Sequence, residues 1–337
     1  MPEDARYISK IYREQYSKYY VDPLVYDVEA LSKKITEKNI YWVVCEKINK
    51  KPEICGTGLI EKRYTTAFAC KAVLKKKYQG KGLSTKLGSG GIIHILRLPE
   101  FKNVVRLDSD VRAVNIKSQK LLEKSGGIGY AFIPSYNNFS NKRKFDASKG
   151  EPCTNGIEEP AILYVNILNT LWKKRQKEIH LIDNEDIYFF YSLMRNKNLR
   201  KMKNDRIIFD EFSGFRTESY QVQKDLYKGM VRIGGYLRKS TLKYLLEKFS
   251  SWRLIEWRIP TTHLGRYSIK LALKNQFKVV GYDVGSMLNY DGDLLDNVVM
   301  CKFPNGIKAK QFKDLHLTKS NQILVNRVLE SIKDQII

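Results

Sequence analysis

Metal-binding and disulfide-forming patterns are missing from this 337-residue sequence. Its five cysteines are an odd number and none stands in a Cys-x-x-Cys pair, and its four histidines are scattered without His-x-x-x-His spacing. We therefore expect no structural zinc, no disulfide framework and no metal cofactor. Cysteines inside the apolar runs are expected to be buried thiols.

Long hydrophobic runs and a signal-peptide core are also missing. No apolar stretch approaches the roughly 18–20 residues that a membrane-spanning helix needs, and the first ten residues mix charged and apolar side chains. Hydrophobic residues still make up 43% of the chain, enough for the cores of two domains. The sequence thus predicts a soluble, cytoplasmic protein without a membrane partner.

Acidic residues are strongly outnumbered. The chain has 36 Asp and Glu against 60 Lys and Arg, which gives a formal net charge of +24. Clustered basic side chains would bind a nucleic acid or an acidic protein, because they release counterions from phosphates. The alternative is a solvated basic surface, since the basic residues are spread over the whole chain. The sequence leaves both interpretations open.

Residue periodicity in the first part of the chain predicts a mixed α/β domain with a mostly antiparallel sheet flanked by helices. The expected helices and strands are a helix over 5–20, a helix over 27–38, strands over 40–46, 53–62 and 65–74, a helix over 84–98, a strand over 104–111, a helix over 115–124 and a strand over 128–134. A polar segment with two prolines and two glycines follows at 141–160, and we expect a linker there. A helix is expected over 161–177.

The second part of the chain resembles the first in its predicted elements. Strands are expected over 207–209, 230–237, 252–260, 277–282 and 297–303, with helices over 240–249 and 265–275 and one or two more within 315–337. Ser240 is placed to cap the first of these helices. Both parts end in a strand that carries a Gly-Tyr pair, so we expect a duplicated domain. The predicted divisions are 1–140, a linker and connecting helix over 141–177, a second domain over 178–304 and a helical tail over 305–337.

The run Gln79-Gly80-Lys81-Gly82-Leu83-Ser84 is the most specific local pattern. It follows a strand-like segment and opens a helix-like one. Two glycines around a lysine leave several backbone N–H groups able to point at one anion, and a helix dipole behind them adds positive potential. The pattern predicts a phosphate-binding loop. The alternative is a plain turn that leads into a helix.

Two polar positions further along offer candidate chemistry. Asp108 and Asp110 lie two apart in the strand predicted over 104–111, so they share one face. Asp110 lies toward the strand's end, and we interpret it as a catalytic or substrate-binding carboxylate. Asn115 opens the next helix, where it is either a functional residue or only a helix N-cap.

These patterns together resemble the GNAT superfamily of N-acetyltransferases over about residues 5–135. The family's acyl-CoA loop has the form Gln/Arg-x-x-Gly-x-Gly/Ala, and Gln79, Gly82 and Ser84 stand at its three defined places. A second signature, Asn-x5-Leu-x-Glu-Lys-x-Gly, is matched by Asn115 with Leu121, Glu123, Lys124 and Gly126. The second half resembles the same fold without the loop, so the resemblance implies a tandem protein whose degenerate C-terminal domain does not bind CoA.

The resemblance also implies a mechanism. Backbone amides of Gly80, Lys81, Gly82, Leu83 and Ser84 would hold the pyrophosphate of acetyl-CoA or another acyl-CoA. Backbone groups of Ala72, Val73 and Leu74 would pair with the pantetheine arm where the family's fourth and fifth strands separate. An N–H near Leu74 would polarise the thioester carbonyl, and Asn115 would bind near the pantetheine or the acceptor.

The sequence departs from the family at two catalytic places. Leu122 stands where many members have a tyrosine that acts as the general acid, and the strand over 65–74 lacks the glutamate that many members use as a base. The preferred interpretation is still an N-acyltransferase that acts on a small-molecule amine. Its alternatives are an acyltransferase that modifies a nucleic acid or protein held by the basic surface, and a non-catalytic CoA-binding protein. The acceptor, the acyl chain and the oligomeric state stay open.

Overall fold

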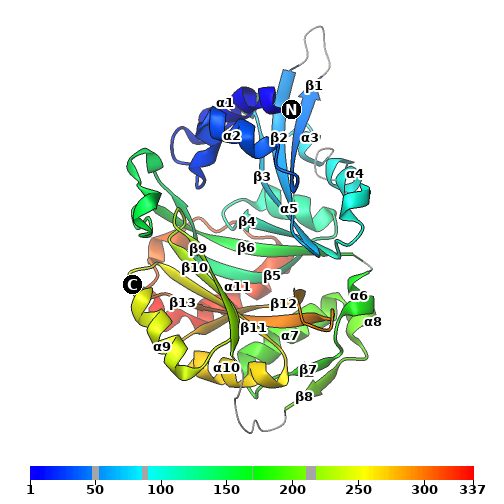
Figure 1. Cartoon of the computed structure of the whole chain (residues 1–337), viewed down its shortest axis with the longest axis vertical. Helices are drawn as coiled ribbons and strands as arrows, with labels where there is room; N and C mark the ends of the chain where they lie inside the picture. Colours follow the sequence, from blue (N-terminus) through cyan, green and yellow to red (C-terminus); the bar gives the residue numbers. More distant parts are fainter. Residues whose placement is uncertain (48–52, 86–89, 169, 210–217) are drawn as a thin grey trace.

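The computed structural model describes residues 1–47, 53–85, 90–168, 170–209 and 218–337. Its centre is one eleven-stranded sheet with the strand order β1-β2-β3-β4-β6-β5-β12-β13-β11-β10-β9. Figure 1 shows the N-terminal strands at one end of the molecule and the C-terminal strands at the other. A small parallel pair, β7 (Glu178–His180) with β8 (Arg206–Ile208), lies apart from the main sheet. The predicted mixed α/β fold, with a mostly antiparallel sheet flanked by helices, is confirmed.

The N-terminal half contributes six strands to the sheet. They are β1 (Ile40–Lys47), β2 (Glu53–Lys62), β3 (Thr66–Leu74), β4 (Arg106–Arg112), β5 (Ile128–Phe139) and β6 (Ile157–Ile167). Its helices are α1 (Ala5–Tyr16), α2 (Val28–Ile35), α3 (Leu83–Thr85), α4 (Ile92–Leu96) and α5 (Ile116–Lys124). Short 3-10 turns include η2 (Pro23–Tyr26) and η3 (Lys76–Tyr78). Residues 48–52, which connect β1 to β2, lie outside the described residues.

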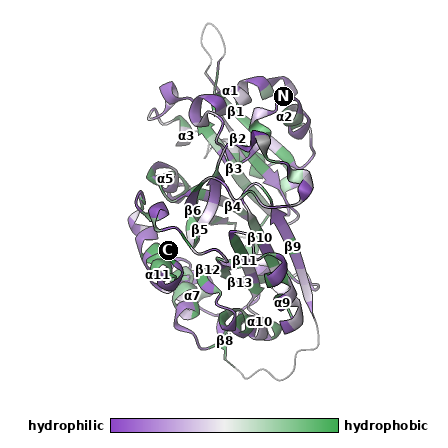
Figure 2. Ribbon diagram, turned by 90° about the vertical axis from the view of Figure 1, so that its left-hand side faces the viewer, coloured by the Kyte–Doolittle hydropathy of each residue, from purple (hydrophilic) through white to green (hydrophobic). Residues whose placement is uncertain are grey.

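The C-terminal half contributes the remaining five strands. They are β9 (Ser219–Asp225), β10 (Met230–Tyr236), β11 (Leu254–Pro260), β12 (Lys278–Leu288) and β13 (Leu294–Lys302). The helices after β6 are α6 (Leu171–Lys174), α7 (Glu185–Lys197), α8 (Leu199–Met202), α9 (Lys239–Lys248), α10 (His263–Lys274) and α11 (Lys319–Ser331). In Figure 2 the hydrophobic colouring is concentrated on the central strands, whereas the edge strand β9 is hydrophilic.

The first strands are covered by helices on both faces, because their side chains alternate. Trp42 and Val44 of β1 pack with α1 and α2 in one apolar cluster. Tyr41 and Val43 pack with α4 in another cluster. Figure 1 shows α1 and α2 on one side of β1–β3 and α4 on the other. Residues of β3 also pack in both clusters, Val73 in the first and Ala67 in the second. This packing fixes the position of β3 and of the loop that follows it.

The strand pairing of the two halves follows the same pattern. In the N-terminal half β2 pairs antiparallel with β3, β3 parallel with β4, and β6 antiparallel with both β4 and β5. In the C-terminal half β9, β10, β11, β12 and β13 take the places of β2, β3, β4, β5 and β6 with the same directions. The helices α5 and α10 occupy equivalent connections, between β4 and β5 and between β11 and β12.

The two halves meet where β5 lies antiparallel to β12. Gly281 of β12 pairs with Ala131 of β5, and a Cβ on Gly281 would meet the Tyr130 carbonyl oxygen at 2.3 Å. Only glycine allows the two backbones to approach this closely. The largest apolar core continues through this junction, from β5 and β6 to β11, β12, β13 and α11. One core therefore joins both halves.

Two local predictions are wrong. The segment predicted as a helix over 161–177 forms β6 and the one-turn helix α6 instead. The residues of β6 are apolar on both faces because β6 is a central strand between β4 and β5, and such a run does not show the alternation that separates a strand from a helix. Ser240 does not cap α9, whose N-cap is Arg238.

Candidate functional site

The sheet of the N-terminal half opens where two parallel strands separate. Residues Thr66–Ala69 of β3 pair with Arg106–Ser109 of β4, and the pairing ends there. Beyond that point β3 continues beside β2, and β4 continues beside β6. We call this place the fork. Ligands of α/β sheets bind outside the carboxyl ends of parallel strands where neighbouring connections diverge, so the fork is the natural place for a site.

The glycine loop follows the carboxyl end of β3. Gly80 has a φ of +77° and Gly82 a φ of +73°, values that L side chains rarely adopt. Chain neighbours aside, no heavy atom of the described residues lies within 4 Å of the place where either Cβ would be, and both residues are exposed. The loop therefore presents its backbone to open space, as an anion-binding loop must. These residues fit the phosphate groups of an acyl-CoA.

Side chains before the loop fix its starting point. Gln79 Nε2 donates a hydrogen bond to the Leu74 carbonyl oxygen at 3.0 Å, and Gln15 Nε2 donates to the same oxygen at 3.3 Å. The Gln79 side chain thus closes the end of β3, a role that the sequence did not show. Ala72 is exposed on the last part of β3, whereas Val73 and Leu74 are buried.

A carboxylate on β2 anchors the turn η3, which leads into the loop. Glu53 accepts hydrogen bonds from the Tyr78 hydroxyl at 2.5 Å and from the ammonium groups of Lys77 and Lys75 at 2.9 Å each. These hydrogen bonds, that of Tyr78 first, lower the pKa of Glu53 to about 2. Lys81 is exposed, with its ammonium 5.7 Å from the centre of the Tyr78 ring.

The helix expected over 84–98 is described in two parts. Leu83 and Ser84 belong to α3, both half-buried, and α4 begins at Ile92. Residues 86–89 of the expected helix lie outside the described part of the chain. The backbone amides of the loop are therefore the groups that we expect to bind an anion.

Asn115 lies after the carboxyl end of β4, at the same edge of the sheet as the loop, because β3 and β4 run parallel. Its Oδ1 accepts a hydrogen bond from the Ser118 N–H at 3.2 Å, so Asn115 is the N-cap of α5. Asn115 therefore acts as a helix N-cap, which was one of the two roles expected for it. Its side chain is half-buried.

The two aspartates of β4 have different surroundings. Asp108 pairs with Arg106, which also lies 2.7 Å from the fully buried Asp283 of β12. Asp108 therefore belongs to the ion pairs at the junction of the halves. Asp110 is the first residue of β4 beyond the fork, and its Oδ2 accepts a hydrogen bond from the Lys228 ammonium at 3.3 Å. Only Asp110 of the two is placed at the fork.

Other charged groups gather at the fork. Lys71, in a bulge of β3 with a φ of +56°, pairs with Asp22 at 2.7 Å. Burial raises the pKa of the adjacent Cys70 thiol to about 11; Lys71 opposes this shift and Asp110 adds to it. Asp22, Lys71 and Lys228 could not be predicted from the sequence. No local signal marks them, because residues 22, 71, 110 and 228 are far apart in the chain and only folding brings them together.

The equivalent place in the C-terminal half is closed. The parallel pairing of β10 with β11 runs from Met230 to Gly234, and α9 begins three residues after β10 ends. The Leu237 N–H donates to Ser268 Oγ at 3.2 Å, and the Arg238 N–H donates to a Glu218 carboxylate oxygen at 2.9 Å. The backbone N–H groups that follow β10 are therefore already hydrogen-bonded to side chains of the C-terminal half.

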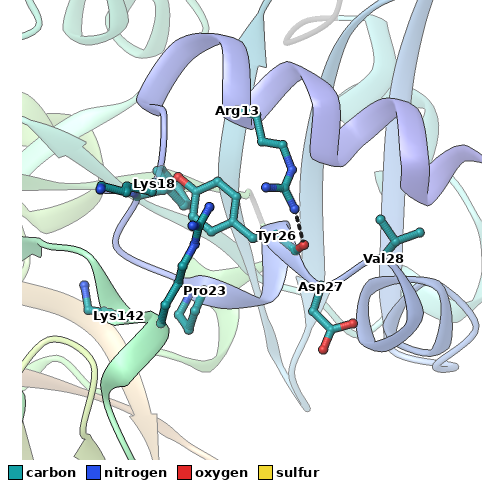
Figure 3. Close-up of a pocket in the computed structure, with 9 residues that line it drawn as sticks. Arg13, Lys18, Pro23, Tyr26, Asp27, Val28 and Lys142 are labelled. Carbon is teal, nitrogen blue, oxygen red and sulfur yellow. Dashed lines mark hydrogen bonds between the residues drawn. The ribbon is translucent and has the colours of Figure 1, made fainter.

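A basic pocket of about 640 Å³ lies between α1, η2 and the segment after β5 (Figure 3). Arg13 donates to the Tyr26 carbonyl oxygen at 2.7 Å, and burial lowers the pKa of the Lys142 ammonium to about 8. The carboxylate of Asp27 caps α2, since it accepts a hydrogen bond from the Ala30 N–H. The residues that line the pocket are Arg13, Lys18, Tyr20, Pro23, Tyr26, Asp27, Val28, Lys142 and Arg143. Four cationic side chains against one carboxylate favour an anionic ligand.

Comparison with known proteins gives remote likenesses to solved structures. No family profile and no curated protein matches the sequence. A chimera that includes the Vibrio cholerae spermidine N-acetyltransferase is 17% identical, with a TM-score of 0.39, over 50% of this chain and 94% of that chain. The Vibrio cholerae enzyme in complex with CoA and spermine is 16% identical, with a TM-score of 0.38, over 49% and 90%.

A third solved structure is the alanine N-acetyltransferase of a ribosomal protein from Escherichia coli. It is 18% identical, with a TM-score of 0.34, over 49% of this chain and 88% of that chain. At such identities and TM-scores, none of these likenesses assigns a function to this protein. Within the described ranges, no helix has the length and apolar character to cross a membrane, and no three potential metal-binding side chains gather in one group.

Proposed function

We propose that this protein is an N-acyltransferase of the GNAT type, which binds an acyl-CoA at the fork and transfers its acyl group to an amine. The observation that carries the proposal is the pair of left-handed glycines, Gly80 and Gly82, exposed at the end of a strand that separates from its parallel neighbour. An exposed backbone loop suits a diphosphate. The unpaired side of β3 next to it suits an extended amide chain.

In the proposed reaction the amine nitrogen forms a bond to the acyl carbon, the carbon–sulfur bond breaks, and the proton released by the amine ends on the thiol. The amides of residues 80–84 bind the diphosphate, and the backbone of Ala72, Val73 and Leu74 aligns the donor. Asp110 holds the acceptor amine and removes its proton. Asn115 contributes its amide nitrogen beside the donor while its oxygen caps α5.

We further propose that the C-terminal half is a degenerate copy of the same domain and does not bind CoA. The repeated strand pairing supports duplication. The loss of the site is supported by the short connection from β10 to α9 and by the side chains that occupy its amides. The preferred acceptor is a small amine, and the proposed location is the cytoplasm.

A second candidate acceptor is favoured by the basic pocket. Arg13, Lys18, Lys142 and Arg143 would repel a polyamine and attract an acceptor that carries phosphate or carboxylate groups, such as a nucleic acid or an acidic protein. Acyl transfer to such an acceptor should weaken steeply with added salt, because counterions compete for the phosphates. Transfer that does not change between 50 and 300 mM salt would exclude this candidate.

The first test combines calorimetry with a transfer assay. Acetyl-CoA should bind the full chain, and radiolabelled acetyl groups should appear on one member of a panel of amines, RNA and acidic peptides. Asp110→Asn should slow transfer by about tenfold or more without weakening acetyl-CoA binding, since general base catalysis contributes factors of 10²–10⁴. The matched control is Asp334→Asn, because Asp334 also pairs with a lysine, Lys278, at 2.8 Å but lies far along the chain in η9.

The outcomes separate the alternatives. No heat with acetyl-CoA would end the donor-site assignment. Binding without transfer to any acceptor would favour the non-catalytic CoA-binding protein. Transfer by the Asp110→Asn variant at the parental rate would make Asp110 a structural residue.

A further inference from the structure

Lys228 lies in a tightly held turn of the C-terminal half. The turn connects β9 to β10, and Gly229 within it has a φ of +62°. The Cys153 N–H donates to the Leu226 carbonyl oxygen at 2.8 Å, the Arg253 N–H donates to the Gly229 carbonyl oxygen at 3.1 Å, and the Arg253 guanidinium donates to the Lys228 carbonyl oxygen. These contacts fix the backbone from both sides. The direction in which the Lys228 side chain leaves the turn is therefore set by the fold.

The side chain of Lys228 reaches the fork of the other half. Its ammonium is 3.3 Å from Asp110 Oδ2 and 3.9 Å from the centre of the Tyr136 ring of β5. The exposed fractions of the Lys228 and Asp110 side chains are only 16% and 18%. An ammonium over an aromatic face and against a carboxylate is held by two attractions that strengthen as water is excluded. This lysine therefore has one defined position.

We propose that Lys228 is a positioning residue of the acyl-transfer site: the C-terminal half uses it to hold the Asp110 carboxylate at the fork of the N-terminal half. The inference rests on the proposed function and gives the degenerate half a role in the reaction. Lys228 binds one oxygen of Asp110, and none of the described residues donates a hydrogen bond to the other oxygen, Oδ1. That oxygen is the one we assign to the acceptor amine.

The charges around Lys228 explain why it positions Asp110 and does not accept the acyl group itself. Burial and the positive charge of Arg232 lower the pKa of the Lys228 ammonium. The Tyr136 phenol and the carboxylates of Asp110 and Asp225 outweigh them, so the pKa of Lys228 is raised. The amine therefore stays protonated at neutral pH and has no free electron pair for attack on a thioester. On the N-terminal side, the titratable groups near the fork among the described residues include Asp22, Cys70, Lys71, Tyr20 and Glu61.

The test uses the full chain with two substitutions at Lys228 and one control. Lys228→Met should leave acetyl-CoA affinity within twofold of the parent and lower kcat/KM for the acceptor by at least tenfold. Lys228→Arg should restore most of the rate. Lys278→Met, which removes the lysine of the exposed pair with Asp334, should match the parent.

The results distinguish this inference from the proposed function. An active parent with an equally active Lys228→Met variant would overturn the inference alone. Loss of acetyl-CoA binding together with loss of activity in Lys228→Met, without recovery in Lys228→Arg, would assign Lys228 to stability and also overturn it. A parent that transfers no acyl group would overturn the proposed function and this inference together.

Discussion

At the scale of single residues, the proposed donor site depends on backbone conformation more than on side-chain chemistry. Positive φ values at residues 80 and 82 favour glycine at both positions, and the open space next to them leaves the amides accessible. The side chains nearby act on the protein itself: Gln79 closes β3 and Asn115 caps α5. Substitutions that change φ should therefore affect donor binding more than substitutions that change charge.

Gly82→Ala tests this expectation. A residue with a Cβ costs roughly 1–2 kcal/mol in the left-handed region, so the loop should shift and acetyl-CoA affinity should fall by about fivefold or more in calorimetry. The control is Gly292→Ala, in the turn between β12 and β13, where φ is +85°. Chain neighbours aside, none of the described residues has a heavy atom within 4 Å of the added Cβ. It should show a similar loss of stability and unchanged affinity. Equal acetyl-CoA affinities for Gly82→Ala and the parent would contradict the loop assignment.

At the scale of elements, the loop is positioned by β2 as well as by β3. Glu53 of β2 binds Lys75, Lys77 and Tyr78, and therefore fixes η3 immediately before the loop. The pKa of Glu53 is lowered to about 2, so the stabilisation from these hydrogen bonds depends on pH. Because the folded-state pKa lies below the unfolded value, the contribution is complete above about pH 4.5 and is lost as the pH falls through about 2.

Glu53→Gln should weaken acetyl-CoA binding by about threefold to tenfold at pH 7, since a neutral amide cannot replace two charge-assisted bonds to lysines. The same measurement at pH 5 should give the same ratio, because Glu53 is still ionised there. The control is Glu61→Gln on the same strand, because the Glu61 carboxylate pairs with the exposed Arg63. A Glu53→Gln variant with parental acetyl-CoA affinity would mean that η3 does not position the loop.

At the scale of the whole molecule, the two halves share one core and a set of buried ion pairs. Asp283 of β12 is fully buried and lies 2.7 Å from Arg106 of β4 and 2.7 Å from Arg258 of β11. It thus joins strands of both halves at their junction. We expect the halves to unfold together, because Asp283 pairs with arginines of both halves and one apolar core joins them.

Asp283→Asn should lower the free energy of unfolding by about 3–5 kcal/mol, because it removes one of the two carboxylates that compensate each of Arg106 and Arg258 at the buried junction. Denaturant unfolding followed by far-ultraviolet circular dichroism and by tryptophan fluorescence should show one shared transition. Glu178→Gln, which breaks an exposed pair with Arg206 (side chains 57% and 74% exposed), should cost less than about 1 kcal/mol. Two separate transitions in the parent would show that the halves are independent domains.

Local sequence was sufficient for features that local backbone chemistry controls. The strands β1, β2 and β3, the start of α5 and the glycine loop follow from residue type, alternation and turn preferences over a few positions, so their location could be predicted to within a few residues. The central strand β6 could not be predicted in this way. Its residues are buried on both faces, so their pattern carries no period, and only the pairing with β4 and β5 makes them a strand.

The set of charged side chains at the fork depends on tertiary structure alone. Asp22, Lys71, Asp110 and Lys228 come from four distant parts of the chain, and the attraction between their charges acts only when the sheet brings them within a few ångströms. The amino-acid order thus specifies the loop that we assign to the donor, since φ is a property of one residue. The surroundings of the acceptor depend on how the two halves pack, since a contact between residues 110 and 228 exists only in the folded chain.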